Sequence, residues 1–216
     1  QPYSGTLKEA FKAAESDSSI TYIKLMNDVA LGAGYIWAEG GKFTFDLNGK
    51  ALTSDTYPLS LRNAIDITID DTSKEQTGKI ESTSTGAAAL TIGDLTAIKI
   101  TIKGGTFKGN QAVYIDGNGS VTLAEVTITG GKFIGNSYVV FANGTSLAVF
   151  GGEFEGGKWG QISWKSGTLD FSNHPAPAGL TVYNGFGSDV TLNGENLGTC
   201  CFAPFICTAE RSQLQK

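Results

Sequence analysis

Aromatic and amide side chains within short apolar segments are the groups in this sequence best suited to bind a ligand. Tyr114 stands in the middle of one apolar triplet, Tyr138 directly precedes the next, and Trp159 and Gln161 precede a third. Exposed rings stack on the apolar faces of sugars, and amides hydrogen-bond to sugar hydroxyls. These four residues therefore predict a glycan-binding surface. The alternative is that the rings only cover strand edges beneath loops.

Two acidic motifs imitate catalytic or calcium-binding sites but depart from them. Glu153 and Glu155 share one face of a predicted strand, at roughly the carboxyl separation of ~5–5.5 Å found in retaining glycosidases. Catalytic pairs usually come from different elements, so we interpret these two as a solvated strand edge. The segment Asp116-Gly117-Asn118-Gly119-Ser120 begins like a calcium loop, but Val121 and Thr127 replace the required Gly and Glu. We predict no catalytic residue, no metal and no cofactor.

Composition excludes several other classes of function. Charged residues make up 17% of the chain and the net charge is −5, which argues against the clustered Lys and Arg that nucleic acid requires. The single histidine, His174, cannot build a His-based zinc cage. No apolar run reaches the roughly 18 residues of a membrane span. The cysteines Cys200, Cys201 and Cys207 all lie near the C-terminus, so no disulfide braces the residues before them.

A single amphipathic helix is predicted at the N-terminus. Thr6-Leu7-Lys8-Glu9 is a capping box, with Thr6 as N-cap and Glu9 reaching back to it. Leu7, Ala10, Phe11 and Ala14 then fall on one face. A short helix before a strand-rich chain serves to cover the open end of a core.

Two series of apolar–variable–apolar triplets follow and predict stacked strands, whose outer residues face a core while the middle residue faces solvent. The first series is Leu59-Ser60-Leu61, Leu90-Thr91-Ile92, Val113-Tyr114-Ile115, Val139-Val140-Phe141, Ile162-Ser163-Trp164 and Leu180-Thr181-Val182. The second is Ile67-Thr68-Ile69, Ile100-Thr101-Ile102, Val126-Thr127-Ile128, Leu147-Ala148-Val149, Leu169-Asp170-Phe171 and Val190-Thr191-Leu192. Ile115, Phe141 and Trp164 are accordingly expected in the core.

The repeat length and its glycines predict the fold. Successive triplets of the first series begin 31, 23, 26, 23 and 18 residues apart. A unit of this size cannot bury its own apolar face, so units must stack. Three members of the second series run into a Gly-Gly corner: Gly104-Gly105-Thr106-Phe107, Gly130-Gly131-Lys132-Phe133 and Gly151-Gly152-Glu153-Phe154. A β-sandwich or a leucine-rich repeat fits this pattern less well.

We therefore expect an all-β fold, a right-handed parallel β-helix (β-solenoid) of about six coils with an N-terminal capping α-helix. Residues 1–42 would form the cap helix and first strands, residues 43–198 the β-helix, and residues 199–216 a C-terminal cap and tail. In that cap, Phe202, Phe205 and Ile206 would fold over the last coil near Leu192 and Leu197, because an open core end and free strand edges invite association.

A resemblance to a known group adds to this interpretation. The matching segments are Leu7-Lys8-Glu9-Ala10, Ile20 to Leu25, Asn27-Asp28-Val29, Phe43 to Lys50 and the Gly-Gly-x-Phe corners. They resemble bacterial cell-surface right-handed parallel β-helix proteins of the pectate-lyase-like superfamily, of the adhesin type without catalysis. The resemblance spans about Leu7 to Leu197. It implies a secreted or cell-surface protein, a monomer, that adheres to a surface glycan or a host surface component. The start at Gln1, without methionine or leader, agrees with an exported chain.

Two other functions stay open. Pectate lyases of similar fold use several Asp residues for calcium and an Arg or Lys as base, so Arg62 with Asp66, Asp70 and Asp71 could form a polysaccharide lyase or glycoside hydrolase site. Asp70 and Asp71 are also ordinary turn residues. The third possibility is a spacer stalk that presents another domain. Outward threonines, such as Thr68, recur without the matched rows of an ice-binding array, and we interpret them as strand filler.

Overall fold

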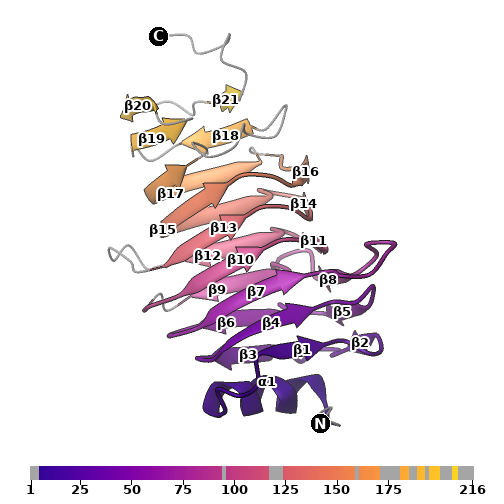
Figure 1. Cartoon of the computed structure of the whole chain (residues 1–216). Helices are drawn as coiled ribbons and strands as arrows, with labels where there is room; N and C mark the ends of the chain where they lie inside the picture. Colours follow the sequence, from indigo (N-terminus) through magenta and orange to yellow (C-terminus); the bar gives the residue numbers. More distant parts are fainter. Residues whose placement is uncertain are drawn as a thin grey trace.

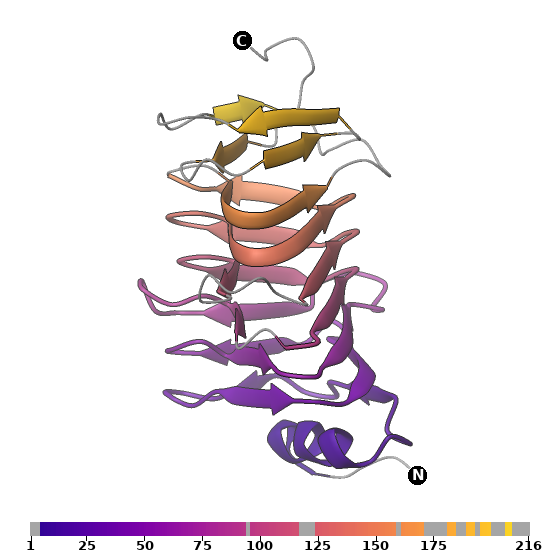
Figure 2. The ribbon, with the colours of Figure 1, turned by 90° about the vertical axis from the view of Figure 1, so that its left-hand side faces the viewer.

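The computed structural model describes residues 5–93, 96–116, 124–158, 161–170, 181–184, 189–192, 195–199 and 206–208 (Figure 1). Within these ranges the strands stack into a parallel β-solenoid of about five turns, and one helix lies at its N-terminal end. Figure 2 shows the turns piled along one axis, with the helix beneath the first turn. The solenoid and its helix confirm the fold predicted from the triplets, with about five turns where about six coils were expected.

Each turn contributes three strands, and equivalent strands of successive turns pair in parallel to form three faces. The first face holds β3 (Ile36–Glu39), β6 (Leu59–Arg62), β9 (Leu90–Gly93), β12 (Val113–Asp116), the first half of β15 (Val140–Val149) and the start of β17 (Ile162–Asp170). The second face holds β1 (Tyr22–Lys24), β4 (Lys42–Asp46), β7 (Asp66–Asp70), β10 (Lys99–Ile102), β13 (Glu125–Ile128) and the second half of β15. The third face holds β2 (Val29–Ala30), β5 (Ala51–Ser54), β8 (Lys79–Ser82), β11 (Thr106–Gly109), β14 (Lys132–Gly135) and β16 (Glu153–Gly156).

The N-terminal helix α1 (Leu7–Ser16) covers part of the first turn. Its capping box is formed as predicted, with the Thr6 hydroxyl accepting from the Glu9 N–H and the Glu9 carboxylate accepting from the Thr6 N–H at 2.8 Å. Its buried Phe11 packs edge-on against Phe43 and Phe45, with ring centroids 5.2 and 5.1 Å apart. The helix therefore closes the core under strand β4.

Inward side chains form continuous columns because equivalent strands pair in register. On the first face Leu59, Leu90 and Val113 stack one above the other and are fully buried. On the third face Phe107 and Phe133 stack with centroids 5.2 Å apart, and Phe154 continues the column 5.1 Å from Phe133. This stacking buries the apolar surface that a single turn would leave exposed.

One register prediction is wrong. The sequence placed Phe141 in the core as the last residue of Val139-Val140-Phe141, but Val140 pairs with Val113 and Phe141 pairs with the outward Tyr114. Four successive small or apolar residues allow two phases of alternation, and here Ala142 takes the inward position paired with Ile115. Phe141 is half-buried on the outside, whereas Ile115 is buried as expected.

The predicted glycine corner between the second and third faces is confirmed. Gly105, Gly131 and Gly152 have φ of +89°, +94° and +100°, values that side chains rarely adopt. A Cβ on Gly131 would lie 2.9 Å from the carbonyl oxygen of Gly105 in the preceding turn. The corner therefore requires glycine for its backbone conformation and for the close approach of two turns.

Among the described strands, the parallel stacking ends at strand β18 (Thr181–Asn184). Strand β18 still pairs in parallel with β17, but β21 (Ile206–Thr208) pairs antiparallel with the other edge of β18. Strand β19 (Asp189–Leu192), which we expected to continue the second series, pairs antiparallel with β20 (Glu195–Thr199) instead. The predicted packing of Phe202 and Phe205 lies outside the described residues, as does the side chain of Trp164.

Candidate functional site

The outer surface of the first face carries an aromatic column. The pairing register places Trp37, Ser60, Thr91, Tyr114 and Phe141 at the same outward position of five successive strands. Tyr35, Tyr57 and Tyr138 lie just before three of these strands. We call the eight residues together the aromatic face: Tyr35, Trp37, Tyr57, Ser60, Thr91, Tyr114, Tyr138 and Phe141.

One ring cluster lies at the C-terminal end of the aromatic face. Tyr114 and Phe141 stack with centroids 4.9 Å apart and planes inclined by 10°, and Tyr138 lies 6.2 Å from Phe141. The Tyr114 hydroxyl donates to Asp116 at 3.0 Å, and the Asn143 amide donates to the same carboxylate at 2.8 Å. Burial, together with the bond to Asp116, raises the pKa of Tyr114, so this hydroxyl stays protonated at neutral pH.

A second ring cluster lies at the N-terminal end. Tyr35 is 5.0 Å from Tyr57 and 6.3 Å from Trp37, measured between centroids. The Arg62 guanidinium lies 4.1 Å from the Trp37 ring centroid, and its Nε donates to the Ser60 hydroxyl at 3.3 Å. Such a cation–π contact fixes the ring. Trp37 nevertheless keeps 41% of its surface exposed and Tyr35 keeps 39%.

The two clusters are held at a fixed separation. Trp37 and Tyr114 are three strand positions apart, which corresponds to about 14 Å at the usual spacing of paired strands. Ser60, which is fully buried and accepts the Arg62 Nε–H, and the half-buried Thr91 lie between them in the column. The arrangement can bind an extended ligand that contacts rings at both ends and passes over Thr91 between them.

The predicted site residues have different outcomes. Tyr114 and Tyr138 both lie in the C-terminal cluster, where Phe141 contacts each of them. The Gln161 amide donates to the carbonyl of Phe154 at 2.9 Å, so this side chain is bound to the start of the third face's last strand. Trp159 lies outside the described residues.

The N-terminal cluster was not predicted from the sequence. Ile36-Trp37-Ala38 has the triplet form and pairs in register with Leu59-Ser60-Leu61, so the same alternation could have found it. The first series was begun one turn too late, although Ile36 precedes Leu59 by 23 residues, a spacing that recurs within the series. Phe141 was missed as a surface residue because its triplet was assigned the wrong phase.

The residues proposed for a lyase site serve separate structural roles. Asp66 forms an ion pair with Lys42 at 3.0 Å. Asp66 and Asp70 stand at opposite ends of β7, about 13 Å apart along the strand. Asp71 is fully buried and accepts the backbone N–H groups of Gly49 at 2.8 Å and Gly78 at 2.6 Å. Nowhere in the described ranges do three or more metal-ligating residues gather.

Asp46 is another buried carboxylate at this corner. It accepts the Tyr22 hydroxyl at 2.5 Å, the Thr72 hydroxyl at 2.6 Å and the backbone N–H groups of Thr72 and Asn48. Burial alone would raise the pKa of Asp46, but these hydrogen bonds outweigh it and lower the pKa to about 2. A carboxylate this strongly engaged stabilises the corner and does not act as a proton donor near neutral pH.

The outward residues of the second face are threonines and charges. Thr44, Thr68, Thr101 and Thr127 lie in register on four successive strands, and Ala148 ends the column. The column is more regular than the sequence spacing suggested, but it is one residue wide. Beside it runs an alternating row of Lys42, Asp66, Lys99 and Glu125.

Comparisons with known proteins give no relative on which to base a function. No family model, curated protein or solved structure matches the chain. The structure also has no helix, in the part of the chain that it describes, with the length and apolar character needed to cross a membrane.

Proposed function

We propose that the aromatic face binds a linear glycan that lies along the solenoid axis. On this proposal the protein is a non-enzymatic, secreted or cell-surface module for adhesion or glycan binding. The observation that carries it is the aromatic column, because two ring clusters about 14 Å apart are fixed on one flat surface by the strand spacing.

The chemistry of the face favours sugar over an apolar partner. Half-buried and exposed rings offer stacking surfaces, and polar groups lie beside both clusters, with Arg62 at one and Asp116 and Asn143 at the other. These polar groups are already oriented by hydrogen bonds or ring contact, so a ligand would meet them in fixed positions. A face that mixes rings with fixed hydrogen-bonding groups matches the alternating apolar and hydroxyl surfaces of a pyranose.

The resemblance to cell-surface β-helix proteins supports the exported setting of this proposal, and a surface glycan or host surface component would be the partner. The solenoid suits that role since it holds a long rigid surface without disulfides in its first 199 residues.

The test is a glycan array of plant, bacterial and host polysaccharides, followed by calorimetry with the strongest hit. Trp37→Ala and Tyr114→Ala should each weaken binding by about tenfold or more, since one stacking contact is worth roughly 1–3 kcal/mol by analogy with aromatic stacking of bases. Thr101→Ala, an outward residue on the second face, is the matched control and should bind as the unchanged protein does.

Three results would overturn the proposal. No binding anywhere on the array would favour the spacer stalk. Release of unsaturated or reducing sugar from a polysaccharide would favour a lyase or hydrolase. Equal losses in Trp37→Ala and Thr101→Ala would show that binding does not use the aromatic face.

A further inference from the structure

The first turn of the solenoid leaves a strand edge without a described partner. Among the described residues, strand β1 stands at the end of its sheet and pairs only with β4. Strand β2 likewise stands at the end of the other sheet and pairs with β5 alone. In every later turn the equivalent strand is covered on the N-terminal side by the turn before it. Helix α1 takes that place only in part, because its buried Phe11 packs on Phe43 and Phe45 of β4.

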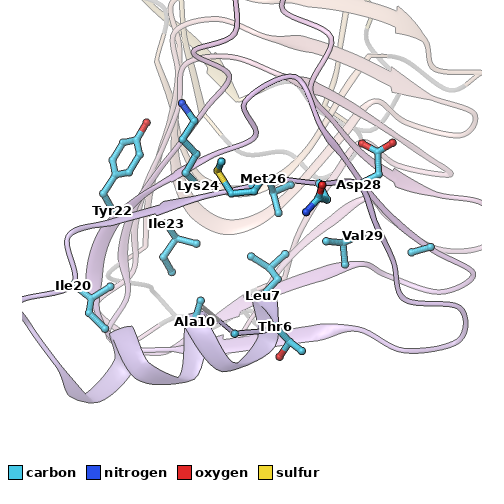
Figure 3. Close-up of a pocket in the computed structure, with 14 residues that line it drawn as sticks. Thr6, Leu7, Ala10, Ile20, Tyr22, Ile23, Lys24, Met26, Asp28 and Val29 are labelled. Atoms are coloured by element: carbon cyan, nitrogen blue, oxygen red, sulfur yellow. The ribbon is translucent and has the colours of Figure 1, made fainter. Parts of the chain in front are cut away.

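A cavity of about 740 Å³ lies between α1 and the segment that carries β1 and β2 (Figure 3). Its apolar lining comes from both sides: Leu7, Ala10, Ile20, Ile23, Met26 and Val29. Met26 is 68% exposed and Tyr22 is 49% exposed, so the mouth of the cavity opens to solvent beside the strand edge. This volume falls within the range of binding pockets in proteins, ~300–1,000 Å³.

The backbone of β1 defines what can bind at this edge. The Thr44 N–H donates to the Thr21 carbonyl, and the Leu25 N–H donates to the Asp46 carbonyl, so the odd-numbered residues bond to β4. In a parallel ladder alternate residues bond to opposite neighbours. The backbone groups of Tyr22 and Lys24 therefore face the outer edge, at the spacing of another extended strand.

The charged groups at the rim already have partners within the fold. The Lys24 ammonium lies 3.6 Å from the Asp46 carboxylate, and the Asp28 carboxylate accepts the Ala51 N–H at 2.9 Å. The remaining lining is uncharged and mostly apolar, with Thr6, Tyr22 and Asn27 as its polar members. A ligand that fits this site therefore has an extended backbone that forms hydrogen bonds with the strand edge. It carries apolar side chains and does not have to be charged.

We propose that an extended peptide segment with alternating apolar residues binds here by adding a strand to the outer edge of β1. Its backbone pairs with Tyr22 and Lys24, and its inward side chains fill the cavity against Ile23, Leu7 and Ala10. Edge addition of this kind takes affinity from main-chain bonds and specificity from pockets for alternate side chains. The site is separate from the aromatic face, and the inference does not depend on glycan binding.

The test uses a capped peptide that copies residues 42–47, the strand that pairs with the opposite edge of β1. Amide hydrogen exchange of the intact chain is followed by NMR with and without peptide. Binding should slow the exchange of the Tyr22 and Lys24 amides by about tenfold or more. Two control peptides should not slow this exchange. One is N-methylated at the positions that face the edge of β1. The other has the same composition, but its apolar residues are consecutive. Unchanged exchange at saturating peptide, or equal protection by the N-methylated peptide, would overturn the proposal.

Variants locate the site. Met26→Glu places a charge at the exposed rim and should weaken peptide binding by about tenfold, a loss of about 1.4 kcal/mol. Lys8→Glu, on the exposed side of α1, is the matched control and should bind normally, as should Trp37→Ala on the aromatic face. Equal loss in Met26→Glu and Lys8→Glu would contradict the site. Self-association that Met26→Glu abolishes would assign the edge to a second copy and also overturn the peptide proposal.

Discussion

The first and third faces of the solenoid share one backbone plan and differ in what their outward residues do. On the third face, outward lysines and glutamates pair across strands, as in Lys108–Glu81 at 2.9 Å and Lys132–Glu155 at 2.9 Å. On the first face the same positions hold rings, with Tyr114 stacked on Phe141. The inward residues of both faces are mostly apolar, although the third face also buries Ser54 and Ser82. Stability thus resides in the inward columns, and the functional difference between faces resides in the outward ones.

The largest expected effect separates an inward ring from an outward one. Phe133→Ala removes the middle of the third face's phenylalanine stack and should lower the free energy of unfolding by about 3–5 kcal/mol. Phe141→Ala removes an outward ring and should cost about 1 kcal/mol, chiefly its stacking on Tyr114. Urea unfolding of both variants measures the difference. Equal costs would mean that the inward and outward assignment is wrong.

The next effect concerns the corner that joins the faces. Gly131→Val forces a β-branched residue to φ +94° and brings its Cβ against the Gly105 carbonyl, so we expect a loss of about 2–4 kcal/mol. Its neighbour Lys132→Ala removes only a surface ion pair with Glu155 and should change stability by less than about 1 kcal/mol. Similar melting temperatures for the two variants would remove the corner assignment.

A pH experiment compares a buried carboxylate with an outward one. Asp46 has a pKa of about 2 when folded, below its ordinary value near ~3.9 in an unfolded chain. Its contribution to stability is therefore complete above about pH 4 and is lost as the pH falls toward 2. Asp46→Asn should cost about 1–3 kcal/mol at pH 7 and flatten the decline of stability between pH 4 and 2.

Asp66→Asn is the matched control for that experiment, because Asp66 is an outward carboxylate paired with Lys42. It should change stability by less than about 1 kcal/mol and keep the same decline at acid pH. If Asp46→Asn retains the full decline, other groups govern the acid sensitivity.

The smallest expected effect is an increase in the free energy of unfolding. Ala64 has φ +54° at the corner between the first and second faces, where alanine is strained. Ala64→Gly should raise the free energy of unfolding by up to about 1 kcal/mol, the strain relieved being partly offset by the greater freedom of unfolded glycine. Ala51→Gly, within strand β5, should instead lower it by about 0.5–1 kcal/mol. A loss of stability in Ala64→Gly would show that its backbone carries no strain.

The fold could be predicted because period-2 alternation and glycine corners are local signals. The alternation predicts an inward column at Ile67, Ile100 and Val126, and the glycine pair predicts a corner at Gly130-Gly131. Neither prediction requires knowledge of long-range contacts. The phase at Phe141 could not be fixed, because Val139, Val140, Phe141 and Ala142 are all compatible with the interior, and only pairing with Tyr114 decides. The buried roles of Asp46 and Asp71 could not be predicted either, since several of their partners, such as Tyr22 for Asp46 and Gly49 for Asp71, come from neighbouring turns.

The candidate site was predicted only in part for the same reason. The alternation of apolar residues predicts that Tyr114 and Tyr138 lie on the surface. Their contacts with Phe141 and the alignment of Tyr114 with Trp37 depend on the register of five strands. Ring contacts between turns depend on how the turns stack, so no single segment of the sequence predicts them.

The most direct measurement of the central claim is calorimetry with a series of oligosaccharides of increasing length, drawn from the glycan that the array identifies. A ligand long enough to span the ~14 Å between Trp37 and Tyr114 should gain about tenfold or more in affinity over a shorter one. That gain should disappear in Trp37→Ala, whereas Phe133→Ala, where it folds, should keep it. An affinity that does not depend on length, or a length dependence that survives Trp37→Ala, would contradict a glycan lying along the aromatic face.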